Sequence, residues 1–515
     1  MGKPWASYDE RMNTFNDRTP VIVGVGEITQ RSKNLTHAME PITLMELALR
    51  AADGDSGGDL LKQIDSLDVV QEFSWPYKDA PGLLSERIGI SPSHKAYGAV
   101  GGETPISFIH EAALRVWKGE VQVAAVVGAE AQYSVTAAEK AGIKLGWSPK
   151  DADARLIRGV DYLHPFAVAL GVASPATVYP FYENAAIAAW NQTPADAALE
   201  SSEIWSRNSE IAEQNPYAWS QTKLAAYEIG LPTAANRLIA WPYTKHMVAN
   251  PLVNQGGAVL ITSVGFARQL GISPDRLVYI WCGAAAHEPD DYLKRDSFTK
   301  VNSQEAVLNN IQEQLGDAEE INFVELYSCF PIVPKMARRI LALPDETNIT
   351  CAGGLSSFGA PLNNYMTHAT AAMVRALRAH PKSIGLVYGQ GGYLTKHHAL
   401  VLASKPSEFN RLMSDYSVQD QVDSNRNPAP PLCTDYAGPS TLETFTVIYG
   451  RDGQVLRGVA ISRTPTGGRV IAEVCGDDQL TIARLVDPDR SPIGLTGSLK
   501  IKCDGLQSWS IRDDN

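Results

Sequence analysis

The sequence predicts an α/β fold made of two similar β/α halves, a long insert in the first half and a small all-β domain at the C-terminus. Three stretches predict it. Residues 97–132 have the pattern of a glycine loop, a buried helix and a buried strand. Residues 353–392 repeat this pattern, and a polar, Pro-rich stretch at 408–440 precedes a region of short strand-like runs. Two glycine-led helices, each followed by an apolar strand, indicate an internal duplication.

The chain is organised around the first of these helices. Gly101-Gly102 permits a tight loop, Thr104 is a good N-cap, and Pro105 suits the first helical position, where no N–H is missed. The helix Ile106–Trp117 is apolar nearly all round, which predicts burial. The apolar strand Val121–Val127 that follows is typical of a parallel sheet covered on both faces. Such a helix N-terminus suits a nucleophile or an oxyanion, yet no nucleophile sits there.

The other elements of the first half surround a long insert. Residues 131–250 are rich in Trp, Tyr and Pro, and a length of this kind between two strands indicates an inserted subdomain or lid. Within it we expect the helices Ser174–Ala189 and Ala195–Glu213, the second opened by Thr193-Pro194 as cap and first residue. Outside it the patterns predict a helix at 45–52 and strands at 19–28, 64–70 and 258–263.

The pattern restarts near Arg276. Strands are expected at 277–281, 321–326 and 383–388, and helices at 303–314, 333–343 and 365–380. Beyond the linker, short runs at 441–448, 458–463, 469–475 and 499–503 with Gly-containing turns predict an OB-like β domain. The expected domain limits are 1–130 with 251–270 for the first half, 131–250 for the insert, 271–407 for the second half, 408–440 for the linker and 441–515 for the β domain.

Composition excludes several classes of function. The 515 residues carry 45 Lys and Arg against 57 Asp and Glu, a net charge of −12, and the OB-like segment lacks a dense basic and aromatic face. We therefore expect no nucleic acid as partner. No stretch approaches the ~18 apolar residues of a membrane span, and the N-terminus lacks a signal-peptide core, so a cytoplasmic protein without a membrane partner is expected. The six scattered cysteines predict neither a disulfide framework nor a metal site.

Residues 19 to about 403 resemble the thiolase superfamily, closest to the sterol-carrier-type thiolases and related thiolase-like proteins. Several segments carry the resemblance in the right order along the chain. They are the strand at 19–28, the Gly101–Gly119 helix with its strand to Gly128-Ala129-Glu130, the run Asn215-Pro216-Tyr217-Ala218, the run Asn254-Gln255-Gly256-Gly257-Ala258, and Gly353-Gly354 followed by Gly359-Ala360-Pro361. The resemblance implies a five-layered αβαβα duplicated core and an inserted loop domain that binds coenzyme A (CoA).

The four residues that carry thiolase chemistry are replaced. In this alignment the acyl-accepting cysteine position is Gly102, and Thr104 stands for the serine of C-x-S. The asparagine position is Tyr327, whereas Cys329 matches a cysteine of the sterol-carrier-type H-D-C-F run. The histidine of G-H-P is Ala360, and the second cysteine falls at Gly389 or Gln390. Because glycine cannot be acylated and alanine cannot donate to an oxyanion, Claisen activity is expected to be weak or absent.

Some groups remain that could act chemically. We predict Tyr327, Cys329 and His398 as catalytic candidates, and the backbone at Gly102 and Gly391 as oxyanion donors. Packing is the alternative for Tyr327, for Cys329 and for either of His397 and His398. His246, Asn250 and Asn254 are predicted to bind CoA, and His368 at the start of the second buried helix is a further candidate.

These observations leave three functions open. The first is a thiolase-like, acetyl-CoA acetyltransferase-like protein of lipid metabolism that processes acyl-CoA with an atypical site. The second is a retro-aldol C–C lyase that acts on a β-hydroxyacyl-CoA through Tyr327, as thiolase-like aldolases use tyrosines. The third is a non-catalytic binder of acyl-CoA. CoA or acyl-CoA is the expected substrate or ligand, no covalently bound cofactor or metal is expected, and both a homodimer and a monomer remain open.

Overall fold

The computed structural model describes residues 17–98, 100–316, 320–407, 412 and 415–511. A nine-stranded sheet runs through its core in the order β3-β2-β4-β7-β1-β8-β11-β10-β9. The first half contributes β1 (Pro20–Thr29), α2 (Pro41–Ser56), β2 (Ser66–Val70), α3 (Ala80–Ile88), β3 (His94–Gly98), α4 (Thr104–Lys118), β4 (Val123–Ala131), β7 (Asn254–Ser263) and α10 (Val264–Gln269). The second half contributes β8 (Val278–His287), α11 (Asn302–Leu315), β9 (Phe323–Leu326), α12 (Ile332–Ile340), α13 (Tyr365–Ala379), β10 (Ile384–Gly391) and β11 (Lys396–Ala403).

The two halves repeat one topology. Outward from the centre of the sheet the strand order is β1, β7, β4, β2 on one side and β8, β11, β10, β9 on the other, so each half places its first strand beside its last. Among the described residues, two pairs join the halves within the sheet, Val21 with Tyr279 and Ile22 with Val278. The predicted duplication is therefore confirmed.

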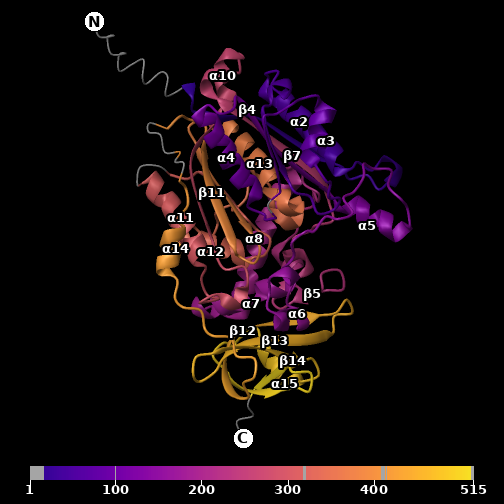
Figure 1. Ribbon diagram of the computed structural model, residues 1–515. Coiled ribbons are helices and arrows are strands. Elements are labelled where there is room, and N and C mark those ends of the chain that lie inside the picture. The colour runs from indigo at the N-terminus through magenta and orange to yellow at the C-terminus, as the bar shows by residue number, and fades with distance from the viewer. Residues whose placement is uncertain (1–16, 99, 317–319, 408–411, 413–414, 512–515) are drawn as a thin grey trace.

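The helices complete five layers. α4 and α13 lie side by side in the middle, where each touches strands of both halves (Figure 1). α2 covers the first-half strands and α11 the second-half strands, each on the side away from this pair. The αβαβα core is confirmed, and both central helices are largely buried, as their apolar patterns predict.

The insert between β4 and β7 is mainly helical. It contains α5 (Gln132–Ala141), α6 (Pro165–Ala169), α7 (Pro175–Ala189), α8 (Pro194–Gln214), α9 (Ala226–Gly230), β5 (Leu238–Ala240) and β6 (Tyr243–Thr244). α8 begins as expected, because Thr193 Oγ1 accepts a hydrogen bond from Asp196 N (3.1 Å) and Asp196 Oδ2 accepts one from Thr193 N (3.3 Å). α7 runs through Pro180 without ending.

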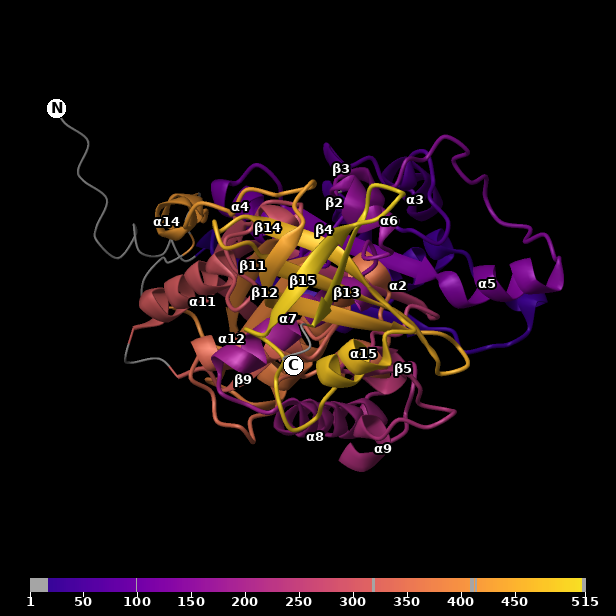
Figure 2. The same cartoon turned by 90° about the horizontal axis from the view of Figure 1, so that it is seen from below.

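The C-terminal strands close into a barrel. β12 (Gly438–Tyr449), β13 (Val455–Arg463), β14 (Arg469–Cys475), β16 (Gln507–Ile511) and β15 (Thr496–Ile501) pair in this order, and β15 returns to β12. α15 (Gln479–Leu485) lies between β14 and β15 in the chain, and β14 and β16 are parallel. This is the five-stranded Greek-key arrangement of an OB-fold, which confirms the predicted β domain. Figure 2 shows the barrel in front of the core.

Several contacts tie the barrel to the rest of the chain, among them hydrogen bonds from Asn184 Nδ2 to the carbonyl oxygen of Phe445 (2.9 Å) and from Thr444 Oγ1 to that of Phe181 (2.5 Å). Ile448 of β12 pairs with Ala240 of β5, so the barrel sheet continues into the insert. The fully buried Arg469 bonds Glu443 within the barrel and donates to the carbonyl oxygens of Leu293 (2.8 Å) and Arg295 in the second half. The predicted linker 408–440 contains α14 (Gln419–Asn425), which lies against β8 and α11.

Two general features of the described residues bear on function. None of their helices combines the length and the apolar composition that crossing a bilayer requires. Within the same residues, no group of three or more His, Cys, Asp or Glu side chains is placed to hold a metal ion. None of the six cysteines, all of which are described, forms a disulfide.

Candidate functional site

The position expected for a nucleophile is filled by another side chain. A Cβ on Gly102 would overlap Tyr327 Oη and Cζ and the carbonyl oxygen of Gln390, so glycine is the residue that fits. The start of α4 corrects one prediction. Thr104 is already helical and the N-cap is Glu103, which makes no side-chain capping bond, because the chain enters the helix one residue earlier than the sequence suggests.

Tyr327 and Cys329 lie in one buried cluster after β9. Gln390 Nε2 donates to Cys329 Sγ (3.2 Å) and to Tyr179 Oη (2.6 Å), and the Phe330 ring stacks on Tyr179 with centroids 4.5 Å apart. Burial raises the pKa of Cys329 to about 12, so the thiol stays protonated at neutral pH. Burial, and to a lesser extent the neighbouring Cys329 and Glu103, raise the pKa of Tyr327 well above its usual range, so its side chain is a neutral phenol at neutral pH.

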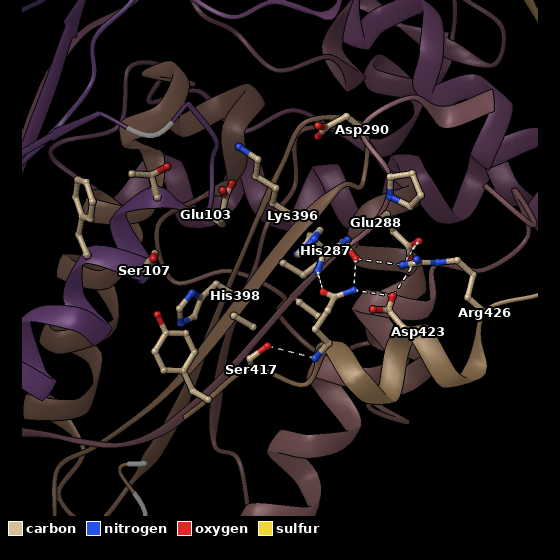
Figure 3. Close-up of a pocket in the computed structure, with 18 residues that line it drawn as sticks. Glu103, Ser107, His287, Glu288, Asp290, Lys396, His398, Ser417, Asp423 and Arg426 are labelled. Atoms are coloured by element: carbon tan, nitrogen blue, oxygen red, sulfur yellow. Dashed lines mark hydrogen bonds and ion pairs between the residues drawn. The ribbon is translucent and has the colours of Figure 1, made fainter. Parts of the chain in front are cut away.

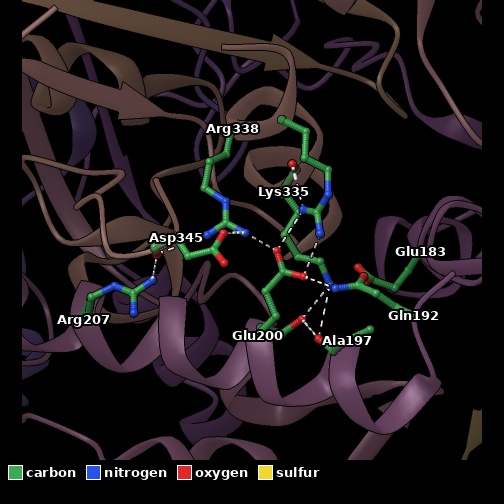
Figure 4. Close-up of polar contacts among 10 residues, drawn as sticks. Glu183, Gln192, Ala197, Glu200, Arg207, Lys335, Arg338 and Asp345 are labelled. Atoms are coloured by element: carbon green, nitrogen blue, oxygen red, sulfur yellow. Dashed lines mark hydrogen bonds and ion pairs between the residues drawn. The ribbon is translucent and has the colours of Figure 1, made fainter. Parts of the chain in front are cut away.

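A buried ion cluster holds the helix that follows this loop (Figure 4). Lys335 of α12 pairs with Glu183 of α7 and donates to Ser201 Oγ (3.1 Å) of α8, with both charged groups fully buried. Glu200 of α8 pairs with Arg338 (2.5 Å) and Arg339 (2.8 Å) of α12. The cluster therefore connects the insert to the segment that carries Tyr327 and Cys329.

Glu103 occupies the space on the other side of the glycine loop. Its carboxylate lies against Gly101 and Gly391, where a Cβ on either residue would overlap it. The residue is 8% exposed, and its Oε2 has no hydrogen-bond partner. Burial raises the pKa of this carboxyl to about 7, an effect that the positive charge of Lys396 partly opposes. The predicted oxyanion positions Gly102 and Gly391 are thus adjacent, and the side chains of Tyr327 and Glu103 fill the space beside them.

Three segments that carry the resemblance to thiolases are joined by hydrogen bonds: 215–218, 254–258 and 353–361. Gln255 Nε2 donates to the carbonyl oxygens of Tyr217 (3.1 Å) and Phe358 (3.0 Å), and Asn215 Nδ2 donates to that of Ala352 (3.0 Å). Gly359 has φ +108° and packs against Gln255, which restricts this position to glycine. Ala360 N donates to the carbonyl oxygen of Asn250 (2.8 Å), and with Pro361 it leads into α13.

A large cavity opens beside these segments; we call it the basic cavity. It has a volume of about 1240 Å³ and is lined by Tyr133, Trp219, Ser220, Thr222, Leu224, Ala234, Ala235, Arg237, Ile239, Lys245, His246, Val248, Ala249, Asn250, Pro251, Leu252, Ser356, Ser357 and Arg451. Arg237, Lys245 and Arg451 are its cations, and none of its lining residues carries a carboxylate. Burial, and then the charge of Lys245, lower the pKa of His246. At its inner wall Ala249 N donates to the carbonyl oxygen of Cys329 (3.3 Å).

A second cavity lies at the start of α4; we call it the acidic cavity (Figure 3). Its volume is about 780 Å³, and its lining comes from the first turns of α4, from the ends of β8 and β11 that lie nearest to them, and from residues 416–426. Four carboxylates line it, those of Glu103, Glu288, Asp290 and Asp423, against the two cations Lys396 and Arg426. No residue lines both cavities.

Comparisons with known proteins agree with this architecture. The family model of the thiolase-like protein type 1 additional C-terminal domain matches residues 417–505. A crystal structure described as a monomeric SCP2-thiolase like protein type 1 (STLP1) from Mycobacterium smegmatis matches with a TM-score of 0.80 and 26% identity, over 96% of this chain and 99% of that chain. These matches show a thiolase-like fold that carries the additional C-terminal domain of thiolase-like protein type 1.

Two further structures resemble this thiolase-like chain in fold alone. One is described as an Ltp2-ChsH2(DUF35) aldolase, with a TM-score of 0.57 and 16% identity over 75% of this chain and 98% of that chain. The other is human mitochondrial 3-ketoacyl-CoA thiolase in complex with CoA, with a TM-score of 0.52 and 16% identity over 76% and 99%. No curated protein sequence matches the chain.

The thiolase-like fold brings together some of the predicted site residues and separates others. Tyr327 meets Gly102, and Cys329 accepts a hydrogen bond from the neighbouring Gln390. His398 lies in the acidic cavity, where its Nε2 is 2.9 Å from His110 Nδ1. Burial lowers the pKa of His398 well below its usual value, so the ring is neutral. His397 also lines this cavity, and its Nδ1 lies 2.6 Å from the hydroxyl oxygen of Tyr388.

The predicted CoA ligands are also divided. His246 and Asn250 line the basic cavity. Asn254 does not line it: the residue is fully buried, and its Nδ2 donates to Ser134 Oγ (2.9 Å) while its Oδ1 accepts from Ser134 N (3.1 Å). His368 is likewise buried, with Nδ1 2.7 Å from Glu27 Oε1. The side chains of Asn254 and His368 therefore bond other buried residues of the core.

Sequence reasoning missed Glu103 and the three cations of the basic cavity. A glutamate between a Gly-Gly pair and the Thr-Pro that opens a buried helix is the one signal that pointed to Glu103. Arg237, Lys245 and Arg451 come from the insert and the barrel, and nothing in their local sequences predicts that they converge.

Proposed function

We propose that this thiolase-like chain binds a CoA thioester in the basic cavity and does not form the acyl-cysteine intermediate of thiolases. One observation carries the proposal: three cations and no carboxylate line a cavity whose inner wall bonds the Cys329 loop. CoA carries phosphate groups at one end and a thioester at the other, so it suits a cavity that is cationic and leads to the core. Trp219 and Tyr133 offer aromatic surface for the adenine ring.

The replaced centre argues against Claisen chemistry through a thiol. Tyr327 fills the nucleophile position, and the nearby thiol of Cys329 is kept protonated by its raised pKa. We therefore expect no thiolysis of acetoacetyl-CoA above the rate without protein.

Binding is tested by isothermal titration calorimetry with CoA and with 3′-dephospho-CoA. We expect CoA to bind, and Arg237→Gln to weaken it by about tenfold, since a charge-assisted bond contributes roughly 1.5–3 kcal/mol. The matched control is Arg490→Gln, an exposed arginine of the barrel that lines neither cavity. If CoA does not bind, or if both variants weaken it equally, the proposal fails.

The placement of Tyr327 favours a second candidate, retro-aldol cleavage of a β-hydroxyacyl-CoA. Its phenol lies where the thiolase nucleophile would stand, and its raised pKa keeps it protonated. In this cleavage the β-hydroxyl becomes the carbonyl of one product as the C–C bond breaks, and the other product is left as an enolate. Tyr327 would give its proton to the α-carbon of the enolate and regain one from the β-hydroxyl, so that the phenol is restored. Tyr327→Phe keeps the ring that fills the site and removes only the hydroxyl. Turnover of a β-hydroxyacyl-CoA that this variant abolishes would establish the lyase. If the protein binds CoA but turns over neither acetoacetyl-CoA nor a β-hydroxyacyl-CoA, then it is a non-catalytic binder of acyl-CoA.

A further inference from the structure

In one half of the acidic cavity, the charged side chains form ion pairs with one another. Arg426 of α14 pairs with Asp423 (3.0 Å) and Glu288 (3.2 Å), and Gln419 Nε2 donates to Asp423 Oδ1 (3.0 Å). Figure 3 shows this group on one side of the cavity, with Glu103, Lys396 and His398 on the other. The charge of Arg426 is thus paired with two carboxylates, although its Nε and Glu288 Oε2 have no hydrogen-bond partner.

The other half contains a carboxylate without a partner. Glu103 Oε2 has no hydrogen-bond partner, although the residue is more than nine-tenths buried and lines the cavity. Lys396 Nζ donates to the carbonyl oxygen of Val100 (2.8 Å), and no ion pair within the described residues joins it to Glu103. A buried carboxylate oxygen with no donor is costly, which indicates a site that a ligand completes.

We infer that the acidic cavity is a binding site for a small organic amine, whose ammonium group bonds the Glu103 carboxylate. The four carboxylates outnumber the two cations, so the cavity attracts positive charge and repels phosphate and carboxylate ligands. The rings of Phe108 and Tyr416 line the same space and favour a cation. The volume of about 780 Å³ is that of a small-molecule site. The site shares no lining residue with the basic cavity, so the inference does not rest on CoA binding.

The ionisation of Glu103 makes the binding depend on pH. The titratable groups that face it are Lys396 of β11, whose charge opposes the effect of burial, and Tyr327, which stays a neutral phenol. His287, Glu288 and Asp290 near the end of β8, and Asp423 and Arg426 of α14, face the rest of the cavity. An ammonium group favours the ionised carboxylate, so binding near pH 7 releases a proton from Glu103 and the affinity rises with pH.

The test uses three probes of matched size and different charge on the full-length protein: ethanolamine, ethylene glycol and glycolate. In calorimetric titrations at pH 8 we expect ethanolamine to bind at least tenfold more tightly than the other two. Glu103→Gln should lower the ethanolamine affinity at least tenfold, and the matched control Glu120→Gln, at the exposed end of α4, should leave it unchanged. Repeating the titration near pH 7 in buffers of different ionisation enthalpy should reveal proton release that Glu103→Gln abolishes and His287→Asn keeps.

Several results would overturn the inference. They are tighter binding of glycolate than of ethanolamine, equal affinities in wild type and Glu103→Gln, proton release that persists in Glu103→Gln, or no binding of ethanolamine at all. A thermal unfolding curve of Glu103→Gln without probe shows whether the variant is folded, so that a lost site is distinguished from a lost fold. CoA titration is a separate experiment, and its failure would not affect this result.

Discussion

The basic cavity and the acidic cavity carry opposite charge. The basic cavity is lined by three cations from the insert and the barrel and by no carboxylate, and its inner wall bonds the Cys329 loop. The acidic cavity is lined by four carboxylates and two cations, and it reaches Glu103, the residue next to Gly102. The comparison teaches that this thiolase-like scaffold separates two environments, one suited to phosphate groups and one to cations.

The largest effect on stability is expected from breaking the buried ion pair between Lys335 and Glu183. Lys335→Met leaves Glu183 buried without its cation, which should lower the free energy of unfolding by about 3–5 kcal/mol. Denaturant unfolding measures it. The double variant Lys335→Met with Glu183→Gln keeps an acceptor for the Tyr243 hydroxyl and should regain most of the loss. If the double variant is as unstable as the single one, packing rather than the ion pair explains the effect.

A smaller effect, which depends on pH, is expected at the acidic cavity. The folded-state pKa of Glu103 is raised to about 7, so the folded protein binds more protons than the unfolded chain between about pH 4.5 and 7, and stability falls as pH rises through this range. Glu103→Gln removes this loss, so at pH 8 it should be more stable than wild type by up to about 3 kcal/mol and at pH 4 nearly equal. Unfolding curves at the two pH values measure the difference.

Glu130 provides the contrast for this prediction. Its pKa is also raised to about 7 by burial, but its carboxylate accepts hydrogen bonds from Phe73 N (2.7 Å) and Ser74 N (2.9 Å). Glu130→Gln should therefore destabilise by about 1–3 kcal/mol at pH 8, because an amide nitrogen would face a backbone N–H. If both variants change the free energy of unfolding at pH 8 by the same amount, then the lack of a hydrogen-bond partner at Glu103 Oε2 does not affect stability.

A loss of similar size is expected at Gly102, which lies against Tyr327. Gly102→Ala places a methyl group against Tyr327 and the carbonyl oxygen of Gln390, and overpacking of this kind should cost about 1–3 kcal/mol. The cost should be coupled to the ring: combined with Tyr327→Leu, the two losses should differ from their sum by at least about 0.5 kcal/mol. Additive losses would mean that Tyr327 does not fill the nucleophile position.

The elements that follow from local pattern could be predicted from the sequence. The burial of α4 and α13 follows from their apolar composition, and the start of α8 from a Thr-Pro-x-Asp cap. The OB-like barrel follows from short alternating runs and Gly turns. Each of these signals depends on residues close together in the chain.

The site depends on contacts between distant residues and could be predicted only in part. The sequence predicts that the thiolase residues are replaced, but the filling of the space at Gly102 by Tyr327 requires the fold. Asn254 reads as a ligand in its motif, yet its amide bonds Ser134 in the core. The acidic cavity needs α14, which lies in a stretch whose polar and Pro-rich composition predicted a linker.

The separation of the two cavities is tested most directly by one calorimetric comparison: CoA titrated into wild type, Arg451→Gln and Glu103→Gln. The account predicts that wild type binds CoA, that Arg451→Gln weakens it by about tenfold, equal to about 1.4 kcal/mol, and that Glu103→Gln leaves it unchanged. No binding to wild type, or an affinity that changes with Glu103→Gln and not with Arg451→Gln, would contradict it.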